Sequence, residues 1–192
     1  GDHVVSGLSL LPGTVFLELA LRGAELAGLD AVDELVITAP LAVAASDTVA
    51  LQIIVDRADD QGARAITLWS RPDPDAECQQ HCSGRVCSGG TTERERIEVW
   101  PPDGEPLDPA AIYAGFAEHG IAYGDSFRRL RALWRAGDEV WAEVALPDGS
   151  GRRAGYLIDP VLLDASLHGL GALFAEGGTG VPYAWSRVEV LA

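Results

Sequence analysis

The first long apolar run of the chain has the pattern of a helix that is buried on most of its sides. Ten of the 18 positions in 12–29 are Val, Leu, Phe or Ala. The narrow polar stripe consists of Glu18, Arg22 and Glu25. Pro12 and Gly13 suit the start of a helix and Gly28 suits its end. Because an apolar helix surface must be covered, we expect this segment at the centre of a folded domain.

Strand-like segments follow this helix and recur later in the chain. They are rich in Val, Ile, Leu and Trp, partly alternate with polar residues, and are bounded by Asp, Gly or Pro. The expected strands are 33–40, 48–56, 64–71, 94–100, 130–135 and 139–146, with a closing strand that begins near Ser186. Gly137 and Asp138 are expected to form the turn between the fifth and sixth of these strands.

Two further helices are predicted where Asp precedes Pro. We expect one at 108–119, with Asp108 as N-cap, and a second, apolar one at 159–176, which also starts at Asp-Pro and ends at Gly177. Each side of the Pro-rich stretch 101–109 thus has one apolar helix and several strands. The pattern favours an α+β protein in two halves, 1–100 and 110–192, joined by the linker 101–109.

Composition narrows the classes of function. The 192 residues are 47% hydrophobic and 22% charged, which is typical of a globular domain. The net charge of −15 argues against a nucleic-acid partner. With no long apolar span and no secretory signal, we expect no membrane partner. The odd number of cysteines, 3, favours the cytoplasm, and the lack of Met suggests a segment trimmed from a longer product.

A carboxyl and two imidazoles are the candidate chemical groups. Asp164 and His168 are four residues apart, on one face of the predicted helix 159–176, among aliphatic residues. Such surroundings should raise the pKa of Asp164 and let it donate a proton, while His3 could accept one. Acid and base together could remove water from a substrate. The alternatives are a solvated terminal His3, a surface Asp164, and a His168 that only hydrogen-bonds Asp164 in the core.

Two motifs that contain these residues resemble a known family. His3-x3-Gly7-x4-Pro12 is similar to the HxxxGxxxxP motif of polyketide synthase dehydratase domains. Asp164-x3-His168 is similar to the second motif of that family, in which Asp is followed four residues later by Gln or His.

Two more motifs of the same family occur in the family's order. The segment Tyr123, Gly124 to Phe127 resembles its YGxxF motif, and the segment with Pro182 and Trp185 resembles its LPFxW motif. The departures are Asp125 in place of Pro, Val181 in place of Leu and Tyr183 in place of Phe. The four motifs together are specific, although each alone would be weak.

The resemblance implies a fold and a reaction. The fold is the double hotdog, in which two antiparallel sheets each wrap around a central helix. Strands that family members have before the first motif and after the last would be missing here. The implied activity is dehydration of a β-hydroxyacyl chain, carried on the phosphopantetheine of an acyl carrier protein, to an α,β-unsaturated thioester. His3, from the first hotdog, would be the base, and Asp164, from the second, the acid.

The resemblance also implies partners and context. The domain would need no cofactor or metal of its own and would act within a multifunctional, cytoplasmic polyketide synthase that makes antibiotic-type products. Its expected partners are an acyl carrier protein, neighbouring synthase domains and a second copy in a homodimer.

Supporting roles follow for the other motif residues. At the start of the first helix, the N–H of Gly13 would bind the thioester oxyanion. Gly7 would allow a tight bend that returns His3 to the site. His168 would orient Asp164, and Tyr123 would either hydrogen-bond near the leaving hydroxyl or pack in the core. The residues expected to shape the site by packing are Pro12, Gly124, Phe127, Pro182 and Trp185.

Two other functions fit the same residues. A double-bond isomerase on this fold could use His3 as its catalytic group, without any part for Asp164 in the reaction. A catalytically inactive dehydratase-like domain could serve as scaffold, although the intact acid and base argue against it.

For two further clusters, one of cysteines with a histidine and one of arginines, we favour a structural role over a binding function. Cys78, His81, Cys82 and Cys87 could suggest zinc, but they crowd into ten residues, so we expect buried or half-exposed thiols in a strand instead. Four arginines of an otherwise acidic chain could dock an acidic carrier protein; a solvated strand face is the favoured interpretation. These arginines are Arg128, Arg129, Arg131 and Arg135.

Overall fold

Neither of the two compact units of the chain is one continuous segment. The computed structural model describes residues 2–44, 46–73, 75–90, 96–147, 155–173 and 180–191. Unit 1 consists of Gly1–Ser9 and Arg94–Gly180, and unit 2 consists of Leu10–Glu93 and Val181–Ala192. These units differ from the predicted halves 1–100 and 110–192, because strands at both ends of the chain pair with strands far away in sequence.

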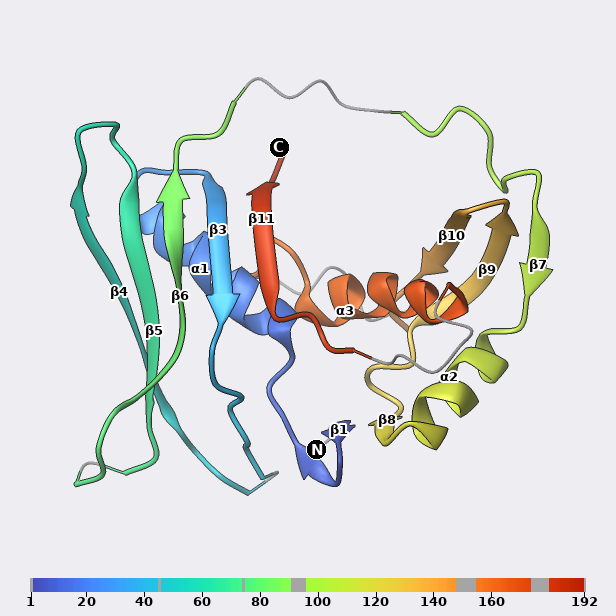
Figure 1. Cartoon of the computed structure of the whole chain (residues 1–192), viewed down its shortest axis with the longest axis horizontal. Coiled ribbons are helices and arrows are strands. Elements are labelled where there is room, and N and C mark those ends of the chain that lie inside the picture. The colour runs from blue at the N-terminus through green and yellow to red at the C-terminus, as the bar shows by residue number, and fades with distance from the viewer. Residues whose placement is uncertain are drawn as a thin grey trace. The chain divides into compact units, whose positions relative to one another are not determined.

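Unit 2 is built on a five-stranded antiparallel sheet and one helix. The strand order is β11-β3-β6-β5-β4. The bounds are Ala31–Ile37 for β3, Ala50–Ala58 for β4, Arg64–Arg71 for β5, Gln79–Cys87 for β6 and Ala184–Glu189 for β11. Helix α1 (Gly13–Leu26) lies against this sheet (Figure 1). Its Phe16, Leu17, Ala20 and Leu21 are at most 2% exposed, which confirms the predicted central helix.

The end of α1 shows why Gly28 is needed. Gly28 has φ +76°, a left-handed conformation that glycine adopts without strain. The Gly28 N–H donates to the Glu25 carbonyl at 3.0 Å, and the Leu29 N–H donates to the Ala24 carbonyl at 2.9 Å. This is the Schellman arrangement, which satisfies carbonyls that the last turn leaves open. The helix therefore ends at Leu26, three residues before the predicted end.

Strands β3 and β6 approach so closely that one of them needs a glycine. A Cβ atom added to Gly84 in β6 would overlap the carbonyl oxygen of Glu34 in β3. We expect Gly84→Ala to destabilise the protein by about 1–3 kcal/mol, because backbone atoms cannot move aside cheaply. Gly115→Ala is the control, since its Cβ would meet nothing within 4 Å; it should stabilise by about 0.5–1 kcal/mol. Chemical denaturation measures both, and equal effects would contradict this packing.

The described part of unit 1 contains two three-stranded antiparallel sheets and the two α-helices α2 and α3. One sheet has the order β2-β1-β8 and the other the order β10-β9-β7. The bounds are His3–Val5 for β1, Leu8–Ser9 for β2, Glu105–Leu107 for β7, Ile121–Tyr123 for β8, Leu130–Ala136 for β9 and Glu139–Val144 for β10. Helix α2 spans Pro109–Glu118, and α3 spans Pro160–His168 and continues as a 3-10 turn over Gly169–Ala172. The buried core consists of Tyr113, Phe116, Ile121, Leu130 and Leu133.

The Asp-Pro starts of both helices are confirmed. The Asp108 carboxylate accepts from the Ala110 N–H at 2.9 Å, and the Asp159 carboxylate accepts from the Val161 N–H at 2.9 Å. Each cap satisfies an N–H that has no partner inside the helix. The second helix is shorter than the predicted 159–176, since α3 ends at His168 and a 3-10 turn follows over Gly169–Ala172; Glu176 and Gly177 lie outside the described residues.

Two predictions about irregular segments differ from the structure. The expected strand 94–100 is wrong over 96–100, which has no strand; 94 and 95 lie outside the described residues. In the expected linker 101–109, Glu105–Leu107 form β7, which pairs with β9. Local sequence failed here because the partner strand, not the composition of the segment, decides whether an edge segment is a strand.

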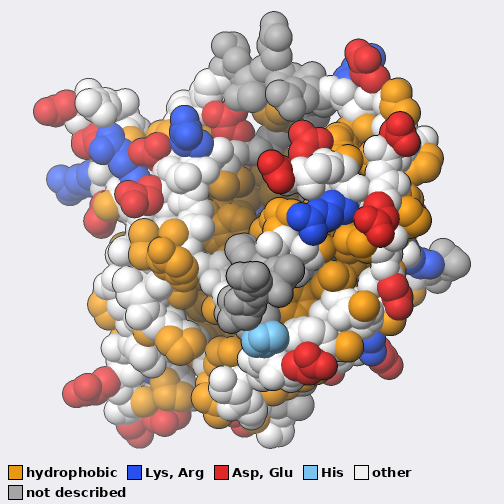
Figure 2. All heavy atoms as spheres, turned by 45° about the vertical axis from the view of Figure 1, so that its right-hand side comes forward, with side chains coloured by type: hydrophobic (Ala, Val, Ile, Leu, Met, Phe, Trp, Pro, Cys, Tyr) orange, Lys and Arg blue, Asp and Glu red, His pale blue; other side chains and the backbone are white. Residues whose placement is uncertain are grey.

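The surface reflects the acidic composition. On the face drawn in Figure 2, acidic side chains appear in several places and arginines form only small groups. This agrees with the net charge of −15. Within the ranges that the structure describes, no helix has both the length and the apolar character needed to cross a membrane.

Candidate active site

His3 lies on strand β1, which a two-residue turn joins to strand β2. Ser6 and Gly7 both have positive φ, 49° and 82°, between the paired residues Val5 and Leu8. Two such residues in sequence make the type I′ turn of a tight hairpin, which favours glycine. Gly7 therefore lies at a tight bend. Strand β1 also pairs with β8, where His3 lies directly opposite Tyr123.

The His3 imidazole is held between aromatic rings. Its ring centroid lies 5.5 Å from that of Tyr123 and 5.7 Å from that of Phe127. The side chain is buried, with 6% of the residue exposed. The motif His3-x3-Gly7-x4-Pro12 and the motif Tyr123 to Phe127 thus meet at this imidazole. The solvated terminal residue that was the alternative for His3 is excluded.

Asp2 ties the loop after β8 to the strand that holds His3. The Asp2 carbonyl accepts from the Gly124 N–H at 2.7 Å, and its carboxylate accepts from the Ser126 hydroxyl at 2.6 Å and the Ser126 N–H at 3.2 Å. These donors from Ser126 lower the pKa of Asp2 below its ordinary value, so it is charged at neutral pH. Gly124 leaves room for the clamp, since a Cβ there would lie 2.6 Å from the Asp2 Cγ.

We expect Asp2→Ala to weaken catalysis without unfolding the protein. Asp2 is exposed, but its loss frees the loop that carries Phe127 against His3. A roughly tenfold lower kcat would follow from this loss of positioning. Asp2→Asn should retain most activity, because its amide oxygen can still accept from Ser126. Asp47→Ala, which removes a similar carboxylate cap on the Ala44 N–H in unit 2, is the matched control. Equal rates for all variants would contradict this role.

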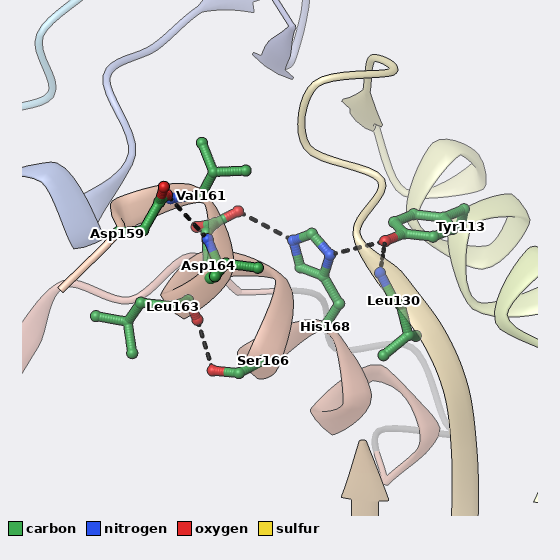
Figure 3. A network of polar contacts seen from close by, with 9 residues as sticks. Tyr113, Leu130, Asp159, Val161, Leu163, Asp164, Ser166 and His168 are labelled. Atoms are coloured by element: carbon green, nitrogen blue, oxygen red, sulfur yellow. Dashed lines mark hydrogen bonds and ion pairs between the residues drawn. The ribbon is translucent and has the colours of Figure 1, made fainter. Parts of the chain in front are cut away.

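Helix α3 supplies the acidic partner. Asp164 and His168 are 3% and 2% exposed, so the alternative of a surface Asp164 is excluded. His168 Nε2 lies 3.0 Å from Asp164 Oδ2. Figure 3 shows the imidazole between this carboxyl and the hydroxyl of Tyr113, whose Oη lies 3.2 Å from His168 Nδ1. Sequence analysis missed Tyr113, because nothing in the local sequence of α2 indicates a partner 55 residues away.

Tyr123 connects the two halves of the cluster. Its ring centroid is 4.0 Å from that of His168 and 5.5 Å from that of His3. Burial raises the pKa of Tyr123, with further contributions from the neighbouring Asp164 and Tyr113, so its hydroxyl keeps its proton at neutral pH. Within unit 1, His3, Tyr123, His168 and Asp164 form one continuous set of contacts. Two imidazoles and a carboxyl thus share a buried aromatic environment, an arrangement in which general acid–base chemistry could take place.

The remaining motif residues lie in unit 2. Gly13 begins α1 after Pro12, and a Cβ on Gly13 would lie 2.7 Å from the carbonyl oxygen of Pro182. The first and fourth motifs are therefore packed together there. Three buried groups in this unit, Thr14 Oγ1, Arg64 Nε and Trp185 Nε1, have no hydrogen-bond partner among the described residues. Gly13 and His3 belong to different units, so the oxyanion role of Gly13 stays a prediction.

Three members of the cysteine cluster, His81, Cys82 and Cys87, lie on β6, and Cys78 directly precedes this strand. Cys82 is buried, and burial raises the pKa of its thiol to about 12. His81 is also buried, with Nε2 2.7 Å from Ser70 Oγ and Nδ1 3.1 Å from the Ala39 carbonyl. Both nitrogens are thus engaged inside the protein. In the described part of the chain, no group of three or more His, Cys, Asp or Glu residues is arranged to hold a metal ion.

Two of the four clustered arginines lie on strand β9, and the other two precede it. Arg131 and Arg135 are exposed on β9, whereas Leu130 and Leu133 are buried. Arg131 Nη2 donates to the Leu146 carbonyl, and Arg135 Nε donates to the Gly137 carbonyl. Arg131 and Arg135 thus agree with the solvated strand face that we favoured over a docking patch, whereas Arg128 and Arg129 lie before the strand and the Arg128 guanidinium packs over the Tyr113 ring.

The comparisons with known proteins cover both parts of the chain. A family model described as polyketide synthase dehydratase domain matches residues 1–71, and one described as polyketide synthase dehydratase N-terminal domain matches residues 92–192. The mycoketide-CoA synthase of Mycobacterium tuberculosis is 42% identical over 98% of this chain. The chain spans only 5% of that protein's length.

Solved dehydratase structures are similar over the full length of the chain. The erythromycin dehydratase is 38% identical with a TM-score of 0.89, and the chain covers 70% of it. A dehydratase studied for substrate selection in the borrelidin and fluvirucin polyketide synthases is 39% identical with a TM-score of 0.88, with 68% of it covered. At these scores the chain shares their fold, which confirms the predicted α+β double hotdog.

Proposed function

The chain belongs to the family of polyketide synthase dehydratase domains, and we propose that His3 is the general base and Asp164 the general acid of its reaction. Members of this family are hydro-lyases that dehydrate β-hydroxyacyl thioesters. The observation that carries the assignment is the contact path from His3 through Tyr123 and His168 to Asp164 within unit 1.

The reaction needs one proton acceptor and one proton donor. Neutral His3 takes a proton from the α carbon, and the electron pair of that C–H bond forms the new double bond. The bond between the β carbon and its hydroxyl breaks, and Asp164 gives a proton to the leaving oxygen, so that water departs. His3 is then protonated and Asp164 is ionised, and transfer of one proton between them, directly or through solvent, restores the starting state. No cofactor is required for this balance.

The neighbours of Asp164 suit the role of an acid. A protonated carboxyl has one oxygen that carries the proton and a second that only accepts hydrogen bonds. His168 faces Oδ2, so Oδ1 is the oxygen that would carry the proton toward the substrate. The protonated Tyr123 hydroxyl would help to hold the leaving β-hydroxyl.

Negative charge develops on the thioester oxygen as the α proton leaves. Such charge is best stabilised by donors that are already in place. The first turn of α1 has N–H groups with no acceptor inside the helix, and Gly13 has no side chain that would block close approach. We therefore assign the Gly13 N–H as the oxyanion donor.

The substrate carrier and the cellular context are part of the same proposal. Since the matched relative is a large synthase, we assign the substrate to the phosphopantetheine arm of an acyl carrier protein, with neighbouring synthase domains and a second copy as further partners. The three cysteines Cys78, Cys82 and Cys87 are free, which supports a reducing cytoplasmic environment.

Mass spectrometry tests the proposed reaction class. The protein is incubated with a β-hydroxyacyl acyl carrier protein, and the mass of the acyl chain is followed with time. The expected result is loss of one water from the acyl chain. An unchanged β-hydroxyacyl chain after long incubation with folded protein would overturn the proposal.

A further inference from the structure

Tyr113 links a backbone donor to the imidazole that faces the proposed acid. The Leu130 N–H donates to Tyr113 Oη at 3.3 Å, and Tyr113 Oη lies 3.2 Å from His168 Nδ1. His168 Nε2 in turn lies 3.0 Å from Asp164 Oδ2. Figure 3 shows these contacts as one line from β9 through α2 to α3. We call this set of hydrogen bonds the Tyr113 relay.

The first member of the relay gives it a direction. A backbone N–H can only donate, so Tyr113 Oη is the acceptor from Leu130. Burial raises the pKa of Tyr113, so its hydroxyl proton is retained. No further acceptor for this proton is found in the part of the chain that the structure describes, so the O–H points to His168 Nδ1. Nδ1 then has to be the unprotonated nitrogen of a neutral imidazole.

The tautomer of His168 decides whether the proton of Asp164 is available. With the proton on Nε2, His168 donates to Oδ2, and the acidic proton sits on Oδ1. With the proton on Nδ1, Nε2 would accept the proton of the carboxyl, and the acid would be held in a hydrogen bond to His168. The first state can protonate a leaving hydroxyl, and the second withholds the proton.

We propose that Tyr113 is a positioning residue that keeps neutral His168 in the Nε2–H tautomer, so that Asp164 presents its acidic proton to the substrate. This inference deepens the proposed function and rests on the role of Asp164 given there.

The surroundings of His168 favour a single tautomer of its imidazole. His168 is 2% exposed, and its ring is packed by Tyr123 at 4.0 Å, Tyr113 at 5.5 Å and Phe116 at 5.8 Å between centroids. This burial keeps the His168 ring away from bulk solvent. The Arg128 guanidinium lies 4.8 Å from the centroid of the Tyr113 ring, a cation–π contact that holds this ring in place.

The first test reads the tautomer without relying on activity. The protein is labelled with ¹⁵N-histidine, and the Nδ1 and Nε2 resonances of His168 are recorded with and without Tyr113→Phe. We expect a protonated Nε2 and an unprotonated Nδ1 in the unchanged protein, and a mixture of tautomers in the variant. A protonated Nδ1 in the unchanged protein, or an identical spectrum in the variant, would overturn the inference.

The second test uses glutamine, the other residue found at the second position of the Asp-x3-Gln/His motif. A glutamine amide donates without tautomers, so the relay should matter only when residue 168 is histidine. We expect Tyr113→Phe to lower kcat about tenfold with little change in KM, but to lower it less than about twofold in a His168→Gln background. Equal losses in both backgrounds would show that Tyr113 acts by packing alone.

The two proposals fail in different ways. If unchanged protein does not dehydrate the thioester although the NMR spectrum shows the Nε2–H tautomer, the proposed function fails. If dehydration occurs but the tautomer does not depend on Tyr113, only the relay fails. Because Tyr113→Phe also removes the acceptor of the Leu130 N–H, thermal unfolding is measured beside each rate, and only folded variants are compared.

Discussion

His3→Phe is expected to lower the rate of dehydration by roughly 10²- to 10⁴-fold, because it removes the group that accepts the α proton. Phenylalanine fills a similar space between Tyr123 and Phe127, so the aromatic packing around residue 3 should survive. The rate is measured on a soluble β-hydroxyacyl thioester, by the appearance of the α,β-unsaturated product.

The control for this variant is a second histidine in the same unit. His119 is exposed at the end of α2, where its Nδ1 lies 2.8 Å from the Gly115 carbonyl. His119→Phe should leave the rate within about twofold, since surface changes seldom disturb a distant site. If the two variants lost activity to the same extent, His3 would not be the base.

Asp164→Asn is the second change with a large expected effect, again roughly 10²- to 10⁴-fold on dehydration. Asparagine has nearly the same shape and can still accept from His168 Nε2, but it has no acidic proton to give. The variant also separates the dehydratase from the isomerase alternative. An isomerase that needs only His3 would still move the double bond of an unsaturated thioester, so both reactions are measured on the same preparation.

Asp138→Asn is the matched control for the acid. Asp138 lies exposed in the turn between β9 and β10. We expect the Asp138→Asn variant to dehydrate at an unchanged rate, since surface changes seldom disturb a distant site. Dehydration by Asp164→Asn at the rate of this control would contradict the assignment of the acid. Isomerisation that persists together with slow dehydration in the unchanged protein would favour the isomerase.

The sequence predicts correctly those elements whose formation depends on residues close together in the chain. The apolar pattern of α1, the caps Asp108 and Asp159, and strand β5 all depend on neighbouring residues, and the structure has them where they were expected. The pairing of β1 with β8 joins residues about 120 positions apart, by the register His3 to Tyr123. No periodicity in the sequence records such a partner, so the two predicted halves differ from the observed units.

The candidate site divides in the same way. His3, Asp164 and His168 could be predicted because they stand in motifs that resemble those of the dehydratase family; the apolar surroundings of Asp164 alone left other interpretations open. Asp2 and Tyr113 could not, because their importance comes from atoms far away in the chain, Ser126 for the first and His168 for the second. Clamps and relays of this kind are three-dimensional properties, so they emerge only once the strands and helices are paired.

The most direct measurement is a crystal structure of the Asp164→Asn variant with a β-hydroxyacyl thioester bound. The account predicts that one ligand spans both groups, with its α carbon in contact with a His3 ring nitrogen and its β-hydroxyl within hydrogen-bond distance of the side chain at position 164. A thioester that binds productively elsewhere, or that reaches only one of these two side chains, would contradict the account.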